Sequence, residues 1–196
     1  MTGHEIGKKL REKLIKAPLN ITANIMAYIQ GFFDGLCGKM GAMMIKQNDK
    51  RLHEQIRATG CNFRSLQAMA EVISGKILTA QQINKAYDDL TQNPKVLAKD
   101  CTCGPQLAQI ILRAMHDLDY KGSAAQVGSI IDGNKGYWGG YSDHNFCVIH
   151  WNTKYPTGHF TLADKDGQEI FDPYDATLSG DLGKSSIRKI LLYKVV

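Results

Sequence analysis

The spacing of apolar residues changes near Asp119, and this change constrains the fold more than any other feature of the sequence. Before it, apolar residues recur at helical spacing within residues 63–73, 83–90 and 107–118. After it, short segments predict strands at about residues 125–127, 145–151, 159–163, 169–171 and 187–194. Helices followed by antiparallel strands are the order of an α+β protein, with the helices packed on the sheet.

Local signals indicate where these helices begin. Thr79 precedes the second stretch and is a good N-cap residue, because its hydroxyl can accept a hydrogen bond from an unpaired backbone N–H. Gly104 and Pro105 precede the third stretch, which predicts a helix with proline in its first turn. Cys61 comes just before the first stretch, so we expect it in the first turn of that helix.

Positive charge is concentrated near the N-terminus: residues 1–60 hold ten Lys/Arg and five Asp/Glu, while the remaining residues hold fourteen of each. Residues 5–16 predict a basic amphipathic helix, followed by an apolar, glycine-punctuated stretch. We therefore expect a basic and apolar helical arm at residues 1–44 and a domain with one core at residues 45–196. The arm is expected to pack on the domain or to mediate oligomerisation, with contact to a membrane surface as the alternative.

Charge and cysteine content exclude several classes of protein. Residues 61–196 have no net charge and no nucleic-acid-binding signature, so we expect no nucleic-acid partner. The five cysteines form an odd set without the spacing of a disulfide scaffold, which predicts a reducing, cytoplasmic location. No small-residue cleavage site follows the basic start, so we expect no signal peptide; secretion by a signal-independent route stays open.

Three potential zinc ligands occur close together in the sequence. His144 and His150 fall on one face of a predicted strand, whereas Cys147 falls on the other, so the three side chains are not expected to converge. We expect neither a metal nor another cofactor.

Cys61 is the candidate nucleophile. Backbone N–H groups at the start of a helix are unpaired, and with the positive end of the helix dipole they favour the thiolate, which is the reactive form. Gly60 allows a close backbone approach, and Gln55, six residues upstream, carries an amide that can stabilise an oxyanion. The alternative is that Cys61 is a small buried residue at the start of a helix.

His159 and Asp172 flank one predicted hairpin. A turn centred on residues 165–166 places them directly opposite, whereas a turn centred on residues 166–167 places Asp172 opposite Thr161 and diagonal to His159. In both registers the two side chains share a face, with their carbons about 4.5–8 Å apart. A three-residue bulged loop would shift this pairing by one position. A carboxylate beside an imidazole is the base and orienting pair that a thiol nucleophile requires.

The order of these features resembles papain-like cysteine peptidases, and most closely the branch of the bacteriocin-leader (double-glycine) peptidases. The features are Gln55 six residues before Cys61, a second helix after a Gly-Lys-x-Leu-Thr motif, a third helix after a glycine, then Gly-His-Phe and Asp-Pro. The resemblance covers Lys46 to Val196. It implies a papain-like fold in which Gln55 assists the oxyanion, Cys61 attacks, His159 is the base and Asp172 orients it.

One departure concerns the nucleophile. Members of this family commonly have Cys-Gly-Pro there, and in this chain that triplet occurs at Cys103 instead. Cys103 is therefore the alternative nucleophile. It has Leu97 six residues upstream in place of a polar residue, and choosing it leaves the two preceding helices unexplained, so Cys61 is preferred.

These observations predict a thiol hydrolase with a Cys-His-Asp triad that acts on an amide or peptide bond of a peptide or protein substrate. Peptide-bond cleavage, side-chain deamidation and cell-wall amide hydrolysis use the same machinery, and all three stay open. The alternative is a catalytically inactive binding protein on the same fold, in which the basic arm engages an acidic partner or a membrane surface.

Overall fold

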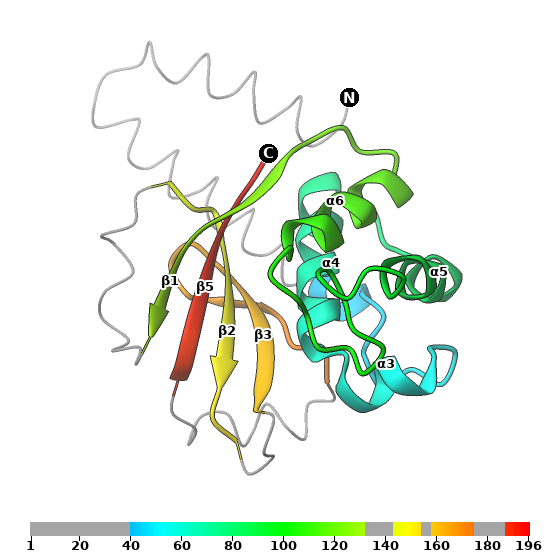
Figure 1. The fold of residues 1–196 in the computed structure, drawn as a ribbon. Helices are drawn as coiled ribbons and strands as arrows, with labels where there is room; N and C mark the ends of the chain where they lie inside the picture. Colours follow the sequence, from blue (N-terminus) through cyan, green and yellow to red (C-terminus); the bar gives the residue numbers. More distant parts are fainter. Residues whose placement is uncertain (1–39, 132–142, 154–157, 175–186) are drawn as a thin grey trace, which may run out of the picture. The chain divides into compact units, whose positions relative to one another are not determined.

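The computed structural model describes residues 40–131, 143–153, 158–174 and 187–196 (Figure 1). Internal contacts divide the chain into two compact units, residues 1–40 and 41–196. Most of the predicted arm, residues 1–44, lies outside the described residues, so the account that follows concerns the second unit.

Five strands form one antiparallel sheet in the order β1-β5-β2-β3-β4 (Figure 1). The C-terminal strand β5 lies between β1 and β2, whereas β2, β3 and β4 are neighbours in sequence and in space. The strands are β1 (Ala124–Ile131), β2 (Phe146–Trp151), β3 (His159–Asp164), β4 (Glu169–Phe171) and β5 (Ile187–Val195).

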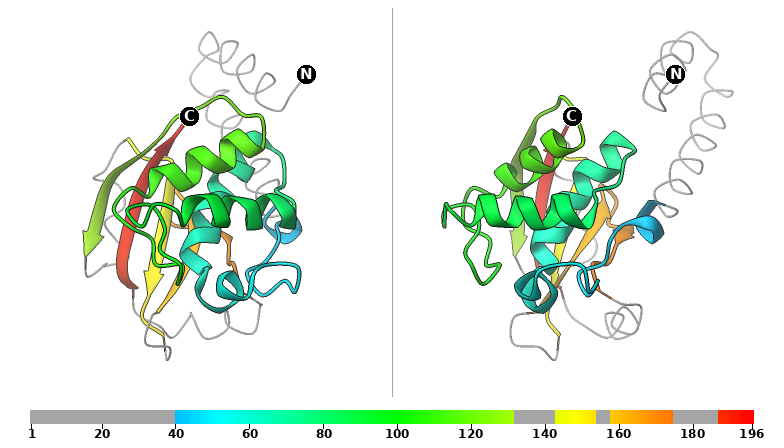
Figure 2. Two further views of the ribbon diagram at one scale, coloured as in Figure 1. Left: turned by 45° about the vertical axis from the view of Figure 1, so that its right-hand side comes forward. Right: turned by 90° about the vertical axis from the view of Figure 1, so that its right-hand side faces the viewer.

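The helices cover one face of this sheet (Figures 1 and 2). They are α3 (Glu54–Thr59), α4 (Cys61–Ser74), α5 (Ala80–Leu90) and α6 (Ala108–Asp117). Helix α4 packs against β3 and against α6, and every residue from Phe63 to Glu71 is buried. It is therefore the central helix of the domain. The predicted α+β class, with helices before an antiparallel sheet, is confirmed.

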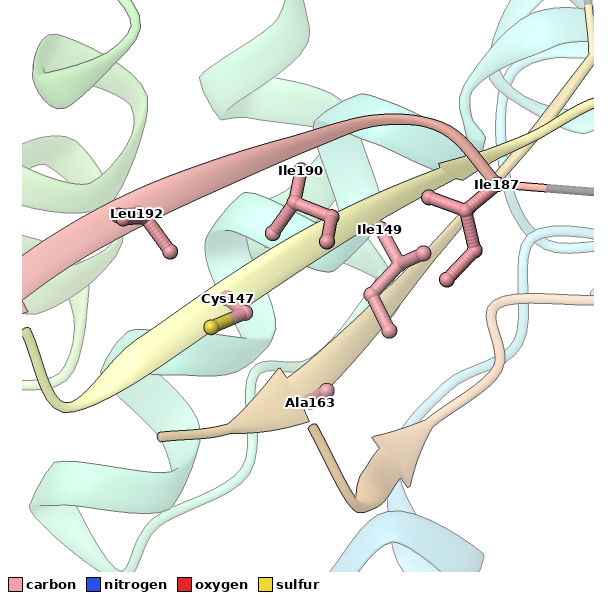
Figure 3. Close-up of a cluster of buried hydrophobic side chains, with 6 residues drawn as sticks. All are labelled: Cys147, Ile149, Ala163, Ile187, Ile190 and Leu192. Carbon is pink, nitrogen blue, oxygen red and sulfur yellow. The ribbon is translucent and has the colours of Figure 1, made fainter. Parts of the chain in front are cut away.

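Both faces of the sheet bury apolar side chains. Alternation along the strands places Val148 and its partners Leu162 and Leu191 on the face opposite that of Cys147 and Ile149. Figure 3 shows Cys147 and Ile149 in front of the strands, with the helices behind. That cluster consists of Cys147, Ile149, Ala163, Ile187, Ile190 and Leu192. A sheet buried on both faces is a rigid support for side chains at its edge.

The predicted start of the second helix is confirmed. The Thr79 hydroxyl accepts the backbone N–H of Gln82, and the Gln82 side chain accepts the N–H of Thr79, which is a complete capping box.

The predicted start of the third helix is wrong, because α6 begins at Ala108. The backbone N–H groups of Gly104 and Gln106 bond to the carbonyls of Val96 and Lys95, so Pro105 lies in a loop that is paired with an earlier segment. Among the described residues no helix has the length and apolar content needed to span a bilayer.

Candidate active site

Cys61 is the first residue of α4, directly after the junction with α3. Gly60 ends α3, where its N–H bonds to the Ile56 carbonyl at 2.8 Å, and its own carbonyl accepts the N–H of Arg64 at 2.9 Å. A Cβ atom at Gly60 would lie 2.5 Å from the Ile56 carbonyl oxygen, so this junction requires glycine. The thiol of Cys61 is free and half-buried, at the helix end where backbone N–H groups and the dipole favour negative charge.

His159 and Asp172 form a buried pair. The ring Nε2 of His159 lies 2.7 Å from Asp172 Oδ1, and both residues are buried. The same carboxylate oxygen accepts the backbone N–H of Tyr174 at 2.9 Å, which fixes its direction. The Tyr174 ring meets the imidazole edge to face, with 6.3 Å between ring centroids. The carboxylate and the imidazole are therefore held in one arrangement.

The hairpin register explains how the pair is formed. Leu162 pairs with Phe171, which continues to Thr161 opposite Asp172 and makes Asp172 the diagonal neighbour of His159. This is the second of the two registers that the sequence allows. Ala163 pairs with Glu169, so Ile170 is the extra residue of a β-bulge. The three residues between Asp164 and Gln168 form a loop one residue longer than a two-residue turn, which alone would shift the pairing by one position. The bulge at Ile170 restores the register that places Asp172 diagonal to His159.

Cys61 also interacts with His159, and this interaction favours the charged form of the ring. Burial of the ring opposes its charged form and lowers its pKa, but the hydrogen bond to Asp172 and the interaction with Cys61 outweigh this and raise the pKa to about 9. Because Asp172 occupies Nε2, Nδ1 is the ring nitrogen left for the thiol. The imidazole is therefore protonated at neutral pH and can stabilise a thiolate. The start of α4, the start of β3 and the segment after β4 bring Cys61, His159 and Asp172 together.

Gln55 lies in α3, and its side chain is engaged within that helix. The amide Nε2 donates to Thr59 Oγ1 at 3.2 Å, and Thr59 Oγ1 in turn donates to the carbonyl of Asp100 at 2.7 Å. In this conformation the amide is hydrogen-bonded to Thr59. A rotation of the Gln55 side chain would be needed to direct the amide toward an oxyanion at Cys61.

Cys103 lies in the loop that follows α5. It forms an isolated bridge with Leu97, and its Sγ lies 3.8 Å from the Cys101 carbonyl oxygen. Part of the residue is exposed, but its surroundings bury the thiol, which raises its pKa far above the usual range. Burial likewise raises the pKa of Cys101 to about 12. Both environments disfavour a thiolate, in contrast to the position of Cys61 beside a protonated imidazole.

The three potential zinc ligands have separate environments. His144 Nε2 lies 3.2 Å from the Lys165 carbonyl oxygen, Cys147 is fully buried among apolar side chains, and the His150 ring stacks on Phe160 with 4.0 Å between centroids. Within the part of the chain that the structure describes, no three His, Cys, Asp or Glu side chains are placed to hold a metal ion.

Two contacts to Asp172 were not anticipated from the sequence. Tyr174 donates its backbone N–H to the carboxylate, a turn that an Asp two residues upstream commonly forms and that Asp-Pro-Tyr could have indicated. Lys46 Nζ donates to the main-chain carbonyl of Asp172 at 2.6 Å. These residues are 126 positions apart, and no local pattern signals the contact.

Comparison with protein-family models, with curated proteins and with solved structures finds no match. The site is therefore defined by its own geometry: a free thiol at the start of a central helix, next to an imidazole that a buried carboxylate orients.

Proposed function

We propose that this chain is a papain-like thiol hydrolase that acts on an amide or peptide bond. One observation carries the proposal: His159 is bonded to Asp172 through Nε2, and the same ring interacts with Cys61. A nucleophile, a base and an orienting carboxylate in this order are the groups that acyl transfer through a thiol requires. A central helix that begins with the thiol and packs on an antiparallel sheet supports the papain-like assignment.

In the first half of the reaction, the Cys61 thiolate attacks the carbonyl carbon of the substrate and forms a tetrahedral intermediate. The imidazolium of His159 gives its proton to the leaving nitrogen as the C–N bond breaks, which leaves an acyl group on sulfur. Asp172 holds the ring so that Nδ1 faces the reacting atoms, and its negative charge stabilises the protonated ring.

In the second half, water attacks the acyl carbon and His159 accepts its proton. The C–S bond then breaks, the acid product leaves, and the thiolate and imidazolium are restored. The backbone N–H of Cys61 and the amide of Gln55, once rotated away from Thr59, would donate to the oxyanion in both halves. The substrate is proposed to be a peptide or protein, cleaved in its main chain or deamidated at a side chain.

The test is the selectivity of thiol alkylation. The native full-length protein is treated with a limiting amount of iodoacetamide at pH 6.5, and the adducts are mapped by mass spectrometry. Cys61 should react well before Cys101, Cys103 and Cys147, because it lies at a helix start beside His159, whereas burial raises the pKa of the other three thiols. His159→Ala should remove this selectivity, whereas Cys103→Ala should preserve it. Equal and slow labelling of all cysteines would exclude the hydrolase.

A cytoplasmic location is proposed from the state of the cysteines. All four cysteines in the described part of the chain are free thiols, which a reducing compartment would maintain.

A further inference from the structure

The residues just before α3 lie against the segment that carries Asp172. We name Ile45–Gln47 the strap. Figure 2 shows the first described residues, in blue, beside the end of β4, in orange. At Gly41 the approach is so close that a Cβ atom would overlap the carbonyl oxygen of Ile170. The strap continues this course past Phe171 and Asp172.

Two hydrogen bonds from the strap hold the main chain at Asp172. Lys46 Nζ donates to the Asp172 carbonyl at 2.6 Å, and the backbone N–H of Gln47 donates to the Pro173 carbonyl at 2.5 Å. The Lys46 ammonium also lies 4.7 Å from the centroid of the Phe171 ring, within the range of a cation–π contact. The two successive carbonyls before and after the Pro173 ring are thus both fixed.

The strap is also bonded to the helix that carries Cys61. The Ile45 carbonyl accepts two hydrogen bonds from the Arg64 guanidinium, from Nε at 3.2 Å and from Nη2 at 3.1 Å. Arg64 is fully buried, and it is held by Glu71 at 3.0 Å and by Gln67 at 2.8 Å. Because a buried guanidinium with these partners has little freedom, the strap is fixed relative to α4.

A third link reaches α3, which carries Gln55. The side chain of Gln47 is buried, and its Nε2 donates to the carbonyl of Arg57 at 3.0 Å. The strap therefore bonds to α3, to α4 and to the segment after β4. These are the segments that carry Gln55, Cys61 and Asp172.

We propose that Lys46 is a positioning residue for the triad, which sets the carboxylate of Asp172 against His159 by holding the Asp172 main chain. This inference rests on the proposed thiol hydrolase and adds a residue to it. The carboxylate is only two bonds beyond the Cα atom, so a shift of the backbone moves it directly away from His159. Lys46 makes the strap's side-chain bond to Asp172, while Ile45 and Gln47 bond through other atoms, so a substitution of Lys46 leaves the rest of the strap in place.

Lys76 offers a matched control. Its Nζ donates to the main-chain carbonyl of Leu118 at 2.6 Å, the same kind of bond at the same length, between α4's C-terminal end and the end of α6. Lys46→Met and Lys76→Met therefore each remove one lysine–carbonyl bond of the same length, and Lys46→Met also removes the contact with the Phe171 ring. A loss that reflects only a missing lysine–carbonyl contact should appear in both variants.

The experiment measures the rate at which iodoacetamide alkylates Cys61 in the native full-length protein at pH 6.5. In Lys46→Met the rate should fall about tenfold, because a displaced reacting group loses this much or more. Lys46→Arg should recover most of the rate, since it keeps a charged donor, and Lys76→Met should match the wild type. If Lys46→Met does not fold, Lys46→Gln and Lys76→Gln form a second matched pair with the same expected difference.

The outcomes separate the two proposals. If wild-type Cys61 is not alkylated selectively, the thiol hydrolase fails and the role of Lys46 fails with it. If wild-type Cys61 is selective and Lys46→Met or Lys46→Gln reacts at the wild-type rate, only the positioning role is overturned. Equal losses in the Lys46 and Lys76 variants would also overturn it.

Discussion

One carboxylate oxygen of Asp172 bonds both to His159 and to the main chain: Oδ1 lies 2.7 Å from the His159 Nε2 and accepts the N–H of Tyr174 at 2.9 Å. The main chain thus directs the carboxylate before any substrate is present. An orienting group that is fixed in this way costs no reorganisation when the charge on the imidazole changes.

Asp172→Asn should lower the pKa of His159 from about 9 by about 1 to 3 pH units, because it removes the negative charge and leaves the burial that opposes protonation. The measurement is an NMR titration of the ring carbons of His159. Asp166→Asn is the control, since Asp166 lies in the exposed turn of the same hairpin and its carboxylate pairs with Lys165. An unchanged pKa in Asp172→Asn would show that Asp172 does not support the protonated ring.

The same pKa predicts how stability depends on pH. His159 has an ordinary pKa of 6.5 when unfolded and about 9 when folded, so the folded state binds the proton more tightly. Its contribution is fully present below pH 6.5 and is lost as the pH rises through about 9; the full difference corresponds to roughly 3 kcal/mol. Urea denaturation from pH 6 to 10 should show this loss in the wild type.

The control for that experiment is His159→Gln, which cannot bind the proton. The difference in the free energy of unfolding between wild type and variant cancels other groups that titrate in this range. That difference should shrink between pH 6.5 and 9. A difference that stays constant across this range would contradict a raised pKa of His159.

Much of the sheet was predictable from the sequence. Apolar and polar residues alternate along a strand wherever its two faces have different surroundings. The strand at Glu169–Phe171 was placed correctly, and His159 was correctly placed at the start of another. Strand β1 runs from Ala124 to Ile131, longer than the three residues predicted, since the register shifts between Gln126 and Gly128 and interrupts the pattern.

The sequence pattern predicted less of the helices and of the candidate site. Helix α3 was not predicted, because its six residues include one buried side chain, Ile56, and no side-chain cap. The hydrogen bond between His159 and Asp172 follows a hairpin register that the sequence narrowed to two. The contacts of Cys61 with His159 and of Lys46 with Asp172 join distant segments, which spacing alone does not encode.

Gly60→Ala should reduce both stability and the alkylation rate of Cys61. A Cβ at this position would lie 2.5 Å from the Ile56 carbonyl oxygen and 2.8 Å from Ile56 Cγ2, so α3 and α4 would have to separate where the thiol is held. Overpacking of this kind costs about 1 to 3 kcal/mol. Thermal unfolding and adduct mapping measure the two effects.

Gly75→Ala at the other end of α4 is the control. Gly75 has a φ of 69°, and its added Cβ would meet nothing within 4 Å, so the variant costs about 1 kcal/mol of backbone strain without moving a neighbour. It should be destabilised while Cys61 reacts at the wild-type rate. If Gly60→Ala also retained the wild-type rate, the junction would not set the position of the thiol.

The buried pair of Arg64 and Glu71 should be costly to break on one side. Both side chains are fully buried and 3.0 Å apart, so Arg64→Met or Glu71→Leu leaves an unpaired buried charge and should cost about 3 to 5 kcal/mol. The double variant should lose less than the sum, because no charge remains. It should not recover wild-type stability, since the Ile45 carbonyl loses its donors and the Leu78 N–H loses its acceptor.

Lys85→Met, which breaks an exposed pair with Asp89, is the control and should cost under about 1 kcal/mol in the same urea titrations. Losses that simply add would mean that the two charges do not stabilise each other within α4.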